Sequence, residues 1–304
     1  MDKEHEILVS YRDALCEAGF LQRTTVDGVY GRSALFERLV GGVEAYLSGA
    51  GADQSPTVVR FPPVVPLELL VRSGYLGSFP TLVGSIRSFK GNEDDHRVLL
   101  AELEEGERWS SAATDTGNAL CPAACHPLYP TLAGGLPPSG RVFDVYGYVF
   151  RHEPSVDPAR MQIFRQYEFV YVGDSLGATS HRDLWLERAF DVLGALGLEV
   201  TTQAATDPFF GRTGRLLADS QRLAGRKTEF LARTSPSEMS TALASVNLHA
   251  DHFGRAFGIR SADGTIAHSA CVGFGVERIV LALLYQHGLD PTSWPSTLRE
   301  RLTT

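Results

Sequence analysis

The segment from Val142 to Val172 reads VFDVYGYVFRHEPSVDPARMQIFRQYEFVYV and contains the clearest structural signal in the chain. Its two ends, residues 142–150 and 163–172, are rich in β-branched and aromatic residues, whereas its middle is polar and contains prolines. This pattern is typical of two strands joined by an irregular turn. We therefore expect a long antiparallel hairpin with a polar tip.

The sequence around this hairpin predicts a mixed α+β domain. The run PTVVRFPPVVP at residues 56–66 is extended, and its prolines exclude it from the centre of a sheet. The run GFGVERIVLALLYQHG at residues 273–288 reads as a strand end that enters an apolar helix and stops at a glycine. No internal repeat or Gly/Ser-rich linker interrupts residues 1–304, so we expect a single domain with a helical extension over about residues 1–50. Further helices are expected at residues 67–74, 96–105 and 183–196.

Composition and charge exclude several classes of protein. The 304 residues include 28 Lys and Arg against 36 Asp and Glu, a net charge of −8, and 43% are hydrophobic. These values exclude a disordered chain, and the acidic balance disfavours extensive binding to nucleic acid. No apolar stretch has the length of a signal peptide or a membrane span, and the 4 cysteines are too dispersed for a disulfide scaffold. We therefore expect a cytoplasmic protein that does not enter a membrane.

Three short motifs follow one another along the chain. Arg151-His152-Glu153 ends the first strand of the hairpin, an Arg and a Phe follow on the returning strand, and residues 273–278 form a G-x-G-x-x-R pattern. Alone, the run at residues 150–153 is compatible with a surface salt-bridge cluster, and the run at residues 273–280 with a glycine-rich strand end that carries one exposed arginine. Together, and in this order, they resemble motifs 2 and 3 of the class II aminoacyl-tRNA synthetase catalytic domain. The segment Arg60–Pro80 resembles motif 1, which builds the dimer interface in that family.

This resemblance, which covers roughly residues 55–290, implies an antiparallel sheet flanked by helices, a homodimer and an ATP site. In such a site a carboxylate attacks the α-phosphorus of ATP, and arginines are suited to the charge that develops on the phosphoryl oxygens. The resemblance assigns Arg151 to the α-phosphate and the substrate carboxylate, and Arg278 to the γ-phosphate. Both are predicted catalytic residues. Glu153 is assigned to the adenine end of ATP.

The returning strand allows two registers. One places the adenine-stacking residue at Phe169 with Arg165 before it, and the other uses Arg160, Phe164 and Glu168. Side chains alternate between the faces of a strand, so the second set shares one face. Its spacing also matches the R-x₃-F-x₃-E pattern of the resembling family, in which the acid meets the amino acid. We therefore choose the second register. The ATP-binding group then comprises Arg151, Glu153, Arg160, Met161, Phe164, Ala242, Leu243, Ala244, Ser245 and Arg278.

One segment departs from the family pattern. Synthetases of this class usually carry an acidic Mg²⁺ ligand three residues before a serine, and here Ala242 stands three residues before Ser245. Mg²⁺ is expected with ATP, but the number of ions stays open. Glu229 and Asn247 are nearby polar residues that could compensate, and either could equally be structural.

Cysteines coincide with the amino-acid pocket that the resemblance implies. The segment LCPAAC places Cys125 where serine-activating enzymes have the glutamate of a P-T-x-E loop, and Cys271 lies just ahead of motif 3. Two thiolates together with Glu168 form a three-ligand set with one open position, as in a catalytic zinc site. The alternatives are buried apolar cysteines, or a ligand supplied by Cys121 or His126. We predict one zinc ion per subunit.

This combination is similar to a narrower group, the amino acid:[carrier protein] ligases, which are relatives of the zinc-dependent seryl-tRNA synthetases of methanogenic archaea. The resemblance implies ATP-dependent activation of glycine or alanine as an aminoacyl-adenylate, and transfer to the phosphopantetheine thiol of a carrier protein. Only about fifty residues precede motif 1, so we expect no tRNA-binding domain and no tRNA substrate. The alternatives are a seryl-type synthetase with a separate tRNA-binding partner, and a catalytically silent paralogue. The densest candidate basic cluster comprises Arg212, Arg215, Arg222, Arg226 and Lys227.

Overall fold

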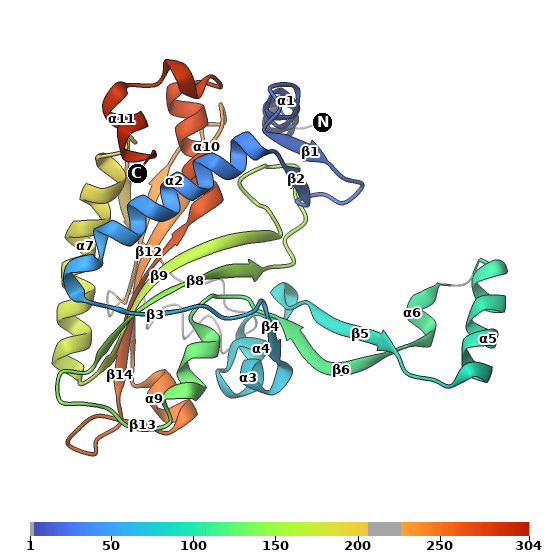
Figure 1. Ribbon diagram of the computed structural model, residues 1–304, viewed down its shortest axis with the longest axis horizontal. Coiled ribbons are helices and arrows are strands. Elements are labelled where there is room, and N and C mark those ends of the chain that lie inside the picture. Colours follow the sequence, from blue (N-terminus) through green and yellow to red (C-terminus); the bar gives the residue numbers. More distant parts are fainter. Residues whose placement is uncertain (1–2, 107, 206–225, 304) are drawn as a thin grey trace.

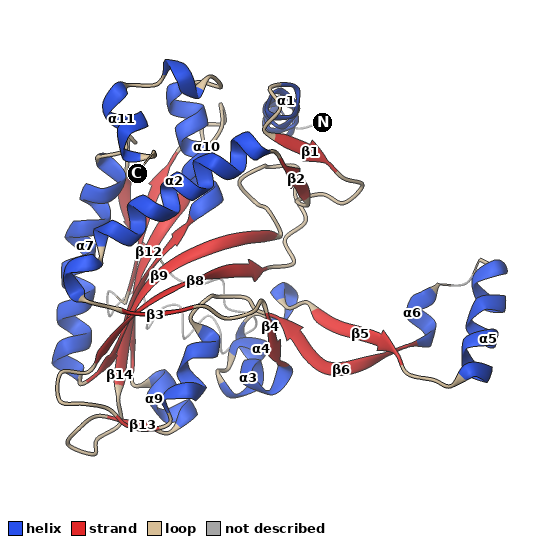
Figure 2. Ribbon diagram, in the orientation of Figure 1, coloured by secondary structure: helices blue, strands red, loops and turns tan. Residues whose placement is uncertain are grey.

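The computed structural model describes residues 3–106, 108–205 and 226–303. At its centre lies a seven-stranded sheet, which is antiparallel except for the parallel pairing of its edge strand β3 with β8 (Figures 1 and 2). Helices flank this sheet, so the expected α+β class with an antiparallel sheet is confirmed. The strands follow the order β10 (Thr201–Ala204), β11 (Lys227–Ala232), β12 (Thr241–Ala250), β14 (His268–Gly275), β9 (Ile163–Gly173), β8 (Arg141–Phe150) and β3 (Thr57–Val59).

The predicted hairpin is present as β8 and β9, which pair from Arg141↔Val172 to Phe150↔Ile163. Because β9 begins at Ile163, Arg160 lies in the connecting loop, and the expectation that it shares a strand face with Phe164 is wrong. The ladder ends there because the amide of Gln162 donates instead to the carbonyl of Gly28, at 2.8 Å.

One face of the sheet is covered by three helices, α2 (Ala34–Ala50), α7 (Ser175–Gly194) and α10 (Val276–His287). Trp185 of α7 stacks on Phe169 of β9 with ring centroids 4.8 Å apart. Helix α7 starts eight residues before the predicted position 183 because the side chain of Asp174 caps it. The first turns of α7 contain the exposed Leu176 rather than an apolar stripe, so periodicity did not reveal them.

The N-terminal region contains two helices, α1 (Lys3–Glu17) and α2, in agreement with the helical extension expected over about residues 1–50, and a small hairpin lies between them. This hairpin consists of β1 (Leu21–Arg23) and β2 (Tyr30–Arg32), paired antiparallel. Its strands contain three residues each, which is too short for an alternation pattern to predict them. Figure 1 shows the hairpin beside the loop that joins β8 and β9.

The predicted extended run at residues 56–66 forms two edge strands, β3 and β4 (Val64–Pro66), as its prolines require. Strand β4 belongs to a three-stranded sheet, order β4-β6-β5, whose hairpin and small helices project from the body (Figure 1). This projecting part comprises β5 (Ser85–Phe89), α5 (Glu93–Glu104), α6 (Trp109–Ala112) and β6 (Ala113–Leu120).

The remaining elements are short. They are α3 (Leu67–Arg72), α4 (Tyr75–Ser78), β7 (Gly134–Gly135), α9 (His252–Phe257), β13 (Ile259–Arg260), α11 (Ser296–Arg301) and the 3₁₀ turns at Ala52–Gln54, Pro80–Leu82, His126–Leu132 and Pro291–Ser293. Within the described ranges, no helix combines the length and the apolar character needed to cross a membrane.

Candidate active site

A cavity of about 650 Å³ lies on the face of the sheet opposite α2, α7 and α10. Almost all of the site residues that the sequence predicts line this cavity. Met161 is the exception, because it is buried nearby but does not line the cavity. The lining includes Cys125, Arg151, Glu153, Arg160, Phe164, Glu168, Ala242, Leu243, Ala244, Ser245, Cys271 and Arg278.

At one end of the cavity, two guanidinium groups approach the ring of Phe164. The Cζ atom of Arg151 lies 5.6 Å from the ring centroid and that of Arg278 lies 5.9 Å from it. Backbone carbonyls hold both arginines. Arg151 Nε donates to Pro122 at 3.1 Å, and Arg278 donates to Ala159 at 2.8 Å and to Ala242 at 3.0 Å. These bonds point both cations toward one aromatic surface.

The charges at this end suit an anionic ligand. Burial lowers the pKa of Arg278 to about 10, and repulsion by Arg151 and Arg160 adds to the shift. Because this pKa is still well above neutral pH, the guanidinium stays charged. The neighbouring carboxylates form long ion pairs with Arg160, at 4.0 Å for Glu153 and 3.9 Å for Asp157. A cluster of cations with weak internal compensation is able to bind a polyphosphate.

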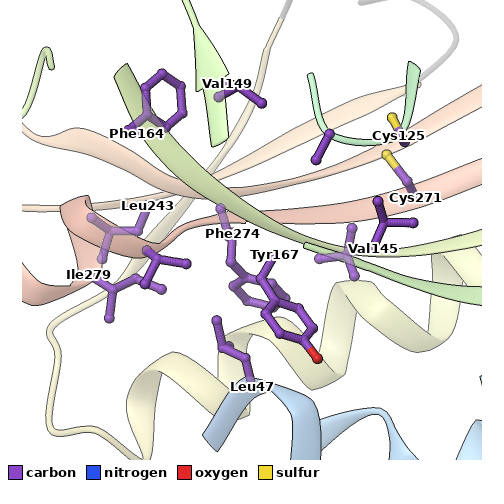
Figure 3. Packing of buried hydrophobic residues seen from close by; sticks show 14 of the residues in the cluster. Leu47, Cys125, Val145, Val149, Phe164, Tyr167, Leu243, Cys271, Phe274 and Ile279 are labelled. Carbon is purple, nitrogen blue, oxygen red and sulfur yellow. The ribbon is translucent and has the colours of Figure 1, made fainter. Parts of the chain in front are cut away.

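At the other end, Cys125, Glu168 and Cys271 are buried beside one another. The amide of Cys125 lies 3.4 Å from Oε1 of Glu168, and Figure 3 shows the sulfur atoms of Cys125 and Cys271 close together. Burial raises the pKa of Glu168 to about 7, and the neighbouring Cys271 adds to the shift. The structure therefore brings together the three side chains that the sequence singled out as metal ligands.

These donors do not form a ready-made coordination set. Across the residues that the structure describes, no group of three or more His, Cys, Asp or Glu side chains could hold a metal ion as placed. The chemistry of the donors nevertheless fits zinc, because Cys125 and Cys271 supply sulfur and Glu168 supplies oxygen from a buried position. Zinc at this position stays a prediction.

The rival ligands differ in their positions. Cys121 does not line the cavity, its Sγ lies 3.0 Å from the carbonyl of Ala123, and burial raises its pKa to about 12, as expected for an inert thiol. His126 does line the cavity, and its Nδ1 has no hydrogen-bond partner within the described part of the chain. Of the two rival ligands, His126 is therefore the one that lines the cavity.

His249, which no sequence motif singled out, lies at the cysteine end of the cavity. A ring nitrogen of His249 lies 3.5 Å from Sγ of Cys271, and Nδ1 lies 3.0 Å from Oγ of Ser269. The signal was present, since Ser245, Asn247 and His249 alternate along β12 and all line the cavity.

The two registers weighed for β9 place different side chains in the cavity. Phe164 and Glu168 line it, whereas Arg165 and Phe169 lie on the helix-covered face. Figure 3 shows the same division, with Phe164 and Tyr167 on opposite sides of the strand. Arg165 is bound there by Glu37, at 2.6 and 2.9 Å.

Two polar residues of β11 also line the cavity. Nζ of Lys227 lies 3.0 Å from Oε1 of Glu229, and Glu229 pairs with Ser245 across the β11–β12 ladder. Glu229 is thus an acid close to the segment in which alanine replaces the usual Mg²⁺ ligand. Of the candidate basic cluster, Arg226 and Lys227 line the cavity. Its other members, Arg212, Arg215 and Arg222, lie outside the described residues.

Comparisons with known proteins find chains of similar sequence and fold, although no protein-family model matches this chain. The chain is 40% identical over 277 residues to amino acid–[acyl-carrier-protein] ligase 2 of Bradyrhizobium diazoefficiens, covering 90% of this chain and 83% of that protein. It is 38% identical over 278 residues to ligase 1 of the same organism, covering 91% and 85%.

Similarity to type-2 serine–tRNA ligases is weaker. The enzyme of Methanopyrus kandleri is 29% identical over 264 residues, which are 80% of this chain and 50% of that enzyme. The crystal structure of M. kandleri SerRS in complex with A. aeolicus tRNASec superimposes with a TM-score of 0.80 at 23% identity, covering 96% of this chain and 59% of that one. This likeness shows that the fold is that of the class II synthetases.

Proposed function

Because the chain belongs to the family of amino acid–[acyl-carrier-protein] ligases, we propose that it activates glycine or alanine with ATP and transfers it to the phosphopantetheine thiol of a carrier protein. One observation supports this most directly. A single cavity has cations and an aromatic ring at one end, and buried thiols and a carboxylate at the other. Such a cavity can accommodate ATP beside an amino acid.

The first step is adenylation. The carboxylate of the amino acid attacks the α-phosphorus of ATP, an aminoacyl-adenylate forms and pyrophosphate leaves. Arg151 stabilises the negative charge on the α-phosphate and orients the attacking carboxylate, while Arg278 binds the γ-phosphate. Phe164 stacks against adenine. The positions of Arg151 and Arg278 around one ring support these roles.

At the other end we propose a zinc ion held by Cys125, Glu168 and Cys271. When bound, the zinc holds the α-amino group of the substrate. Burial of three potentially anionic groups supports a divalent cation there, because an uncompensated buried charge is unfavourable. For Mg²⁺ on the phosphates, Glu229 is the acid whose position supports a role beside Ser245.

The second step forms a thioester. The phosphopantetheine thiolate attacks the carbonyl of the adenylate, the new C–S bond forms, and AMP leaves with the bonding electrons. The names of the two Bradyrhizobium relatives support a carrier protein as acceptor. The net charge of −8 also favours it over tRNA, whose binding depends on many phosphate contacts. The similarity to type-2 serine–tRNA ligases makes a seryl-type synthetase the second candidate.

We further propose that the enzyme is a homodimer that associates through Arg60–Pro80 and acts in the cytoplasm, where ATP is abundant. The exposure of Val64 and Val71 within this segment supports an interface. Arg60 is less available, because it donates to the carboxylate and the carbonyl of Asp144 within the same chain, at 2.8 and 2.9 Å.

One experiment tests the acceptor and the amino acid together. Enzyme and ATP are incubated with labelled glycine, alanine or serine, and with either a holo carrier protein or total tRNA. We expect label on the carrier that hydroxylamine removes, as for a thioester. The apo carrier, which has no thiol arm, is the matched control. Label on tRNA and none on any holo carrier would overturn the assignment.

A further inference from the structure

The β1–β2 hairpin touches the loop that carries Arg160. At the tip of the hairpin, the amide of Gln162 donates to the carbonyl of Gly28 and its Nε2 donates to the carbonyl of Asp27, both at 2.8 Å. The carbonyl of Gln162 in turn accepts from the amide of Arg151 at 2.9 Å. The tip is therefore linked to Arg151 through one intervening residue.

This contact requires glycine at the tip. Gly28 has a φ of +76°, and a Cβ atom there would lie 3.0 Å from the carbonyl oxygen of Arg160. Any larger residue would be strained and would push against the loop. The backbone of the hairpin therefore approaches the loop as closely as a side-chain-free residue permits.

The base of the hairpin reaches the beginning of α10. Arg32 donates to Oε1 of Glu277 at 2.7 Å and to the carbonyl of Ile163 at 3.0 Å. Glu277 is only 1% exposed and also accepts from the amide and Nε of Arg165, both at 2.7 Å. The next residue after Glu277 is Arg278, which faces the cavity.

We propose that the β1–β2 hairpin is a positioning element of the ATP site. Its tip holds the loop that carries Arg160, and Arg32 at its base holds the start of β9 against the start of α10. Phe164 and Arg278 are thereby fixed relative to one another. Charge-assisted bonds to a buried carboxylate restrict motion, and small displacements in a site of this kind weaken catalysis strongly. This inference rests on the proposed ATP-dependent activation.

Substitution of Arg32 can separate positioning from folding. In Arg32→Met, Glu277 keeps its two bonds to Arg165, so no buried charge is left without a partner. Arg23→Met is the matched control, because Arg23 lies on the same hairpin, has a side chain that is 56% exposed, and makes a long contact of 3.5 Å with Asp13. Arg32→Lys keeps the positive charge beside Glu277.

The test measures ATP–pyrophosphate exchange, ATP binding by calorimetry and thermal unfolding for the parent and these variants. We expect Arg32→Met to raise the KM and the Kd for ATP roughly tenfold, with the KM for the amino acid within about twofold of the parent. Arg32→Lys should recover part of the loss, and Arg23→Met should match the parent.

Two results would overturn the inference. One is unchanged ATP binding in Arg32→Met, and the other is an equal loss for both substrates together with a lowered melting temperature. If Arg32→Met does not fold, Gly28→Ala perturbs the tip alone and should raise the KM for ATP in the same selective way. If no amino acid supports ATP–pyrophosphate exchange by the parent enzyme, the proposed function is refuted instead.

Discussion

Glu277 and Arg278 are consecutive residues that serve opposite faces of the sheet. Glu277 is buried on the helix-covered face, where Arg32 and Arg165 bind it, whereas Arg278 lines the cavity. The first turn of α10 thus contains both a buried carboxylate that links neighbouring elements, Glu277, and the residue predicted to contact phosphate, Arg278. Substitutions on the two faces should therefore have different consequences.

Arg278→Ala should abolish pyrophosphate exchange with little change in folding stability. The variant loses hydrogen bonds to Ala159 and Ala242, at a cost of about 1 kcal/mol each, but it also removes repulsion by Arg151. Exchange kinetics and thermal unfolding check this expectation. Arg255→Ala, at an exposed ion pair with Asp251, is the control and should change stability by about 0–1 kcal/mol at most. Undiminished exchange in Arg278→Ala would contradict the phosphate role.

Phe164→Leu and Phe169→Leu should behave differently although both are buried in β9. Arg151 and Arg278 both approach the ring of Phe164, so loss of this ring should raise the KM for ATP about tenfold. Phe169 stacks on Trp185, so its loss should lower the melting temperature and leave the KM for ATP unchanged. Steady-state kinetics with both variants decide between the registers. A selective rise in KM for ATP in Phe169→Leu would favour the rejected register.

Elemental analysis of the purified protein should find about one zinc per chain. Cys271→Ser should lose the metal together with amino-acid-dependent exchange, because a serine hydroxyl is a poor zinc ligand. Cys16→Ser is the control, since Cys16 lies in α1 and does not line the cavity. Full activity of metal-free Cys271→Ser would refute the zinc proposal.

The ion pair between Glu37 and Arg165 should make stability depend on pH. Hydrogen bonds from Arg165 lower the pKa of Glu37 below its ordinary value of 4.5. The pair therefore stabilises the fold at pH values above 4.5, and this contribution is lost as the pH falls from 4.5 through the lower pKa of the folded state. Glu37→Gln should be less stable than the parent at pH 7 in urea unfolding, and the difference should shrink in acid. A constant difference across pH would show that the carboxylate charge is irrelevant.

Val71→Glu should convert the proposed dimer into monomers. Val71 is 50% exposed in the Arg60–Pro80 segment, and a buried charge at an interface is unfavourable. Light scattering coupled to size exclusion measures the change. Leu176→Glu is the control, because Leu176 is 80% exposed on α7, away from that segment. A parent that is monomeric at micromolar concentration would rule the interface out.

Much of the site follows from local patterns in the sequence. Alternation along residues 163–172 separates Phe164 and Glu168 from Arg165 and Phe169, and the structure places the two pairs on opposite faces. A glycine stop sets the end of α10, which ends at His287 before Gly288. These features depend on the backbone geometry of a single element, and a short window of sequence contains that information.

Contacts between segments that are distant along the chain could not be predicted from the sequence and are seen in the folded structure. Arg32 and Glu277 are 245 residues apart, and neither local sequence contains a pattern that predicts their contact. The same holds for His249 beside Cys271, and for the choice of Cys125 over Cys121 at the cavity wall. The physical reason is that periodicity determines which face of an element a side chain occupies. Its partner across the core depends on how whole elements pack, which arises from the sum of many contacts along the chain.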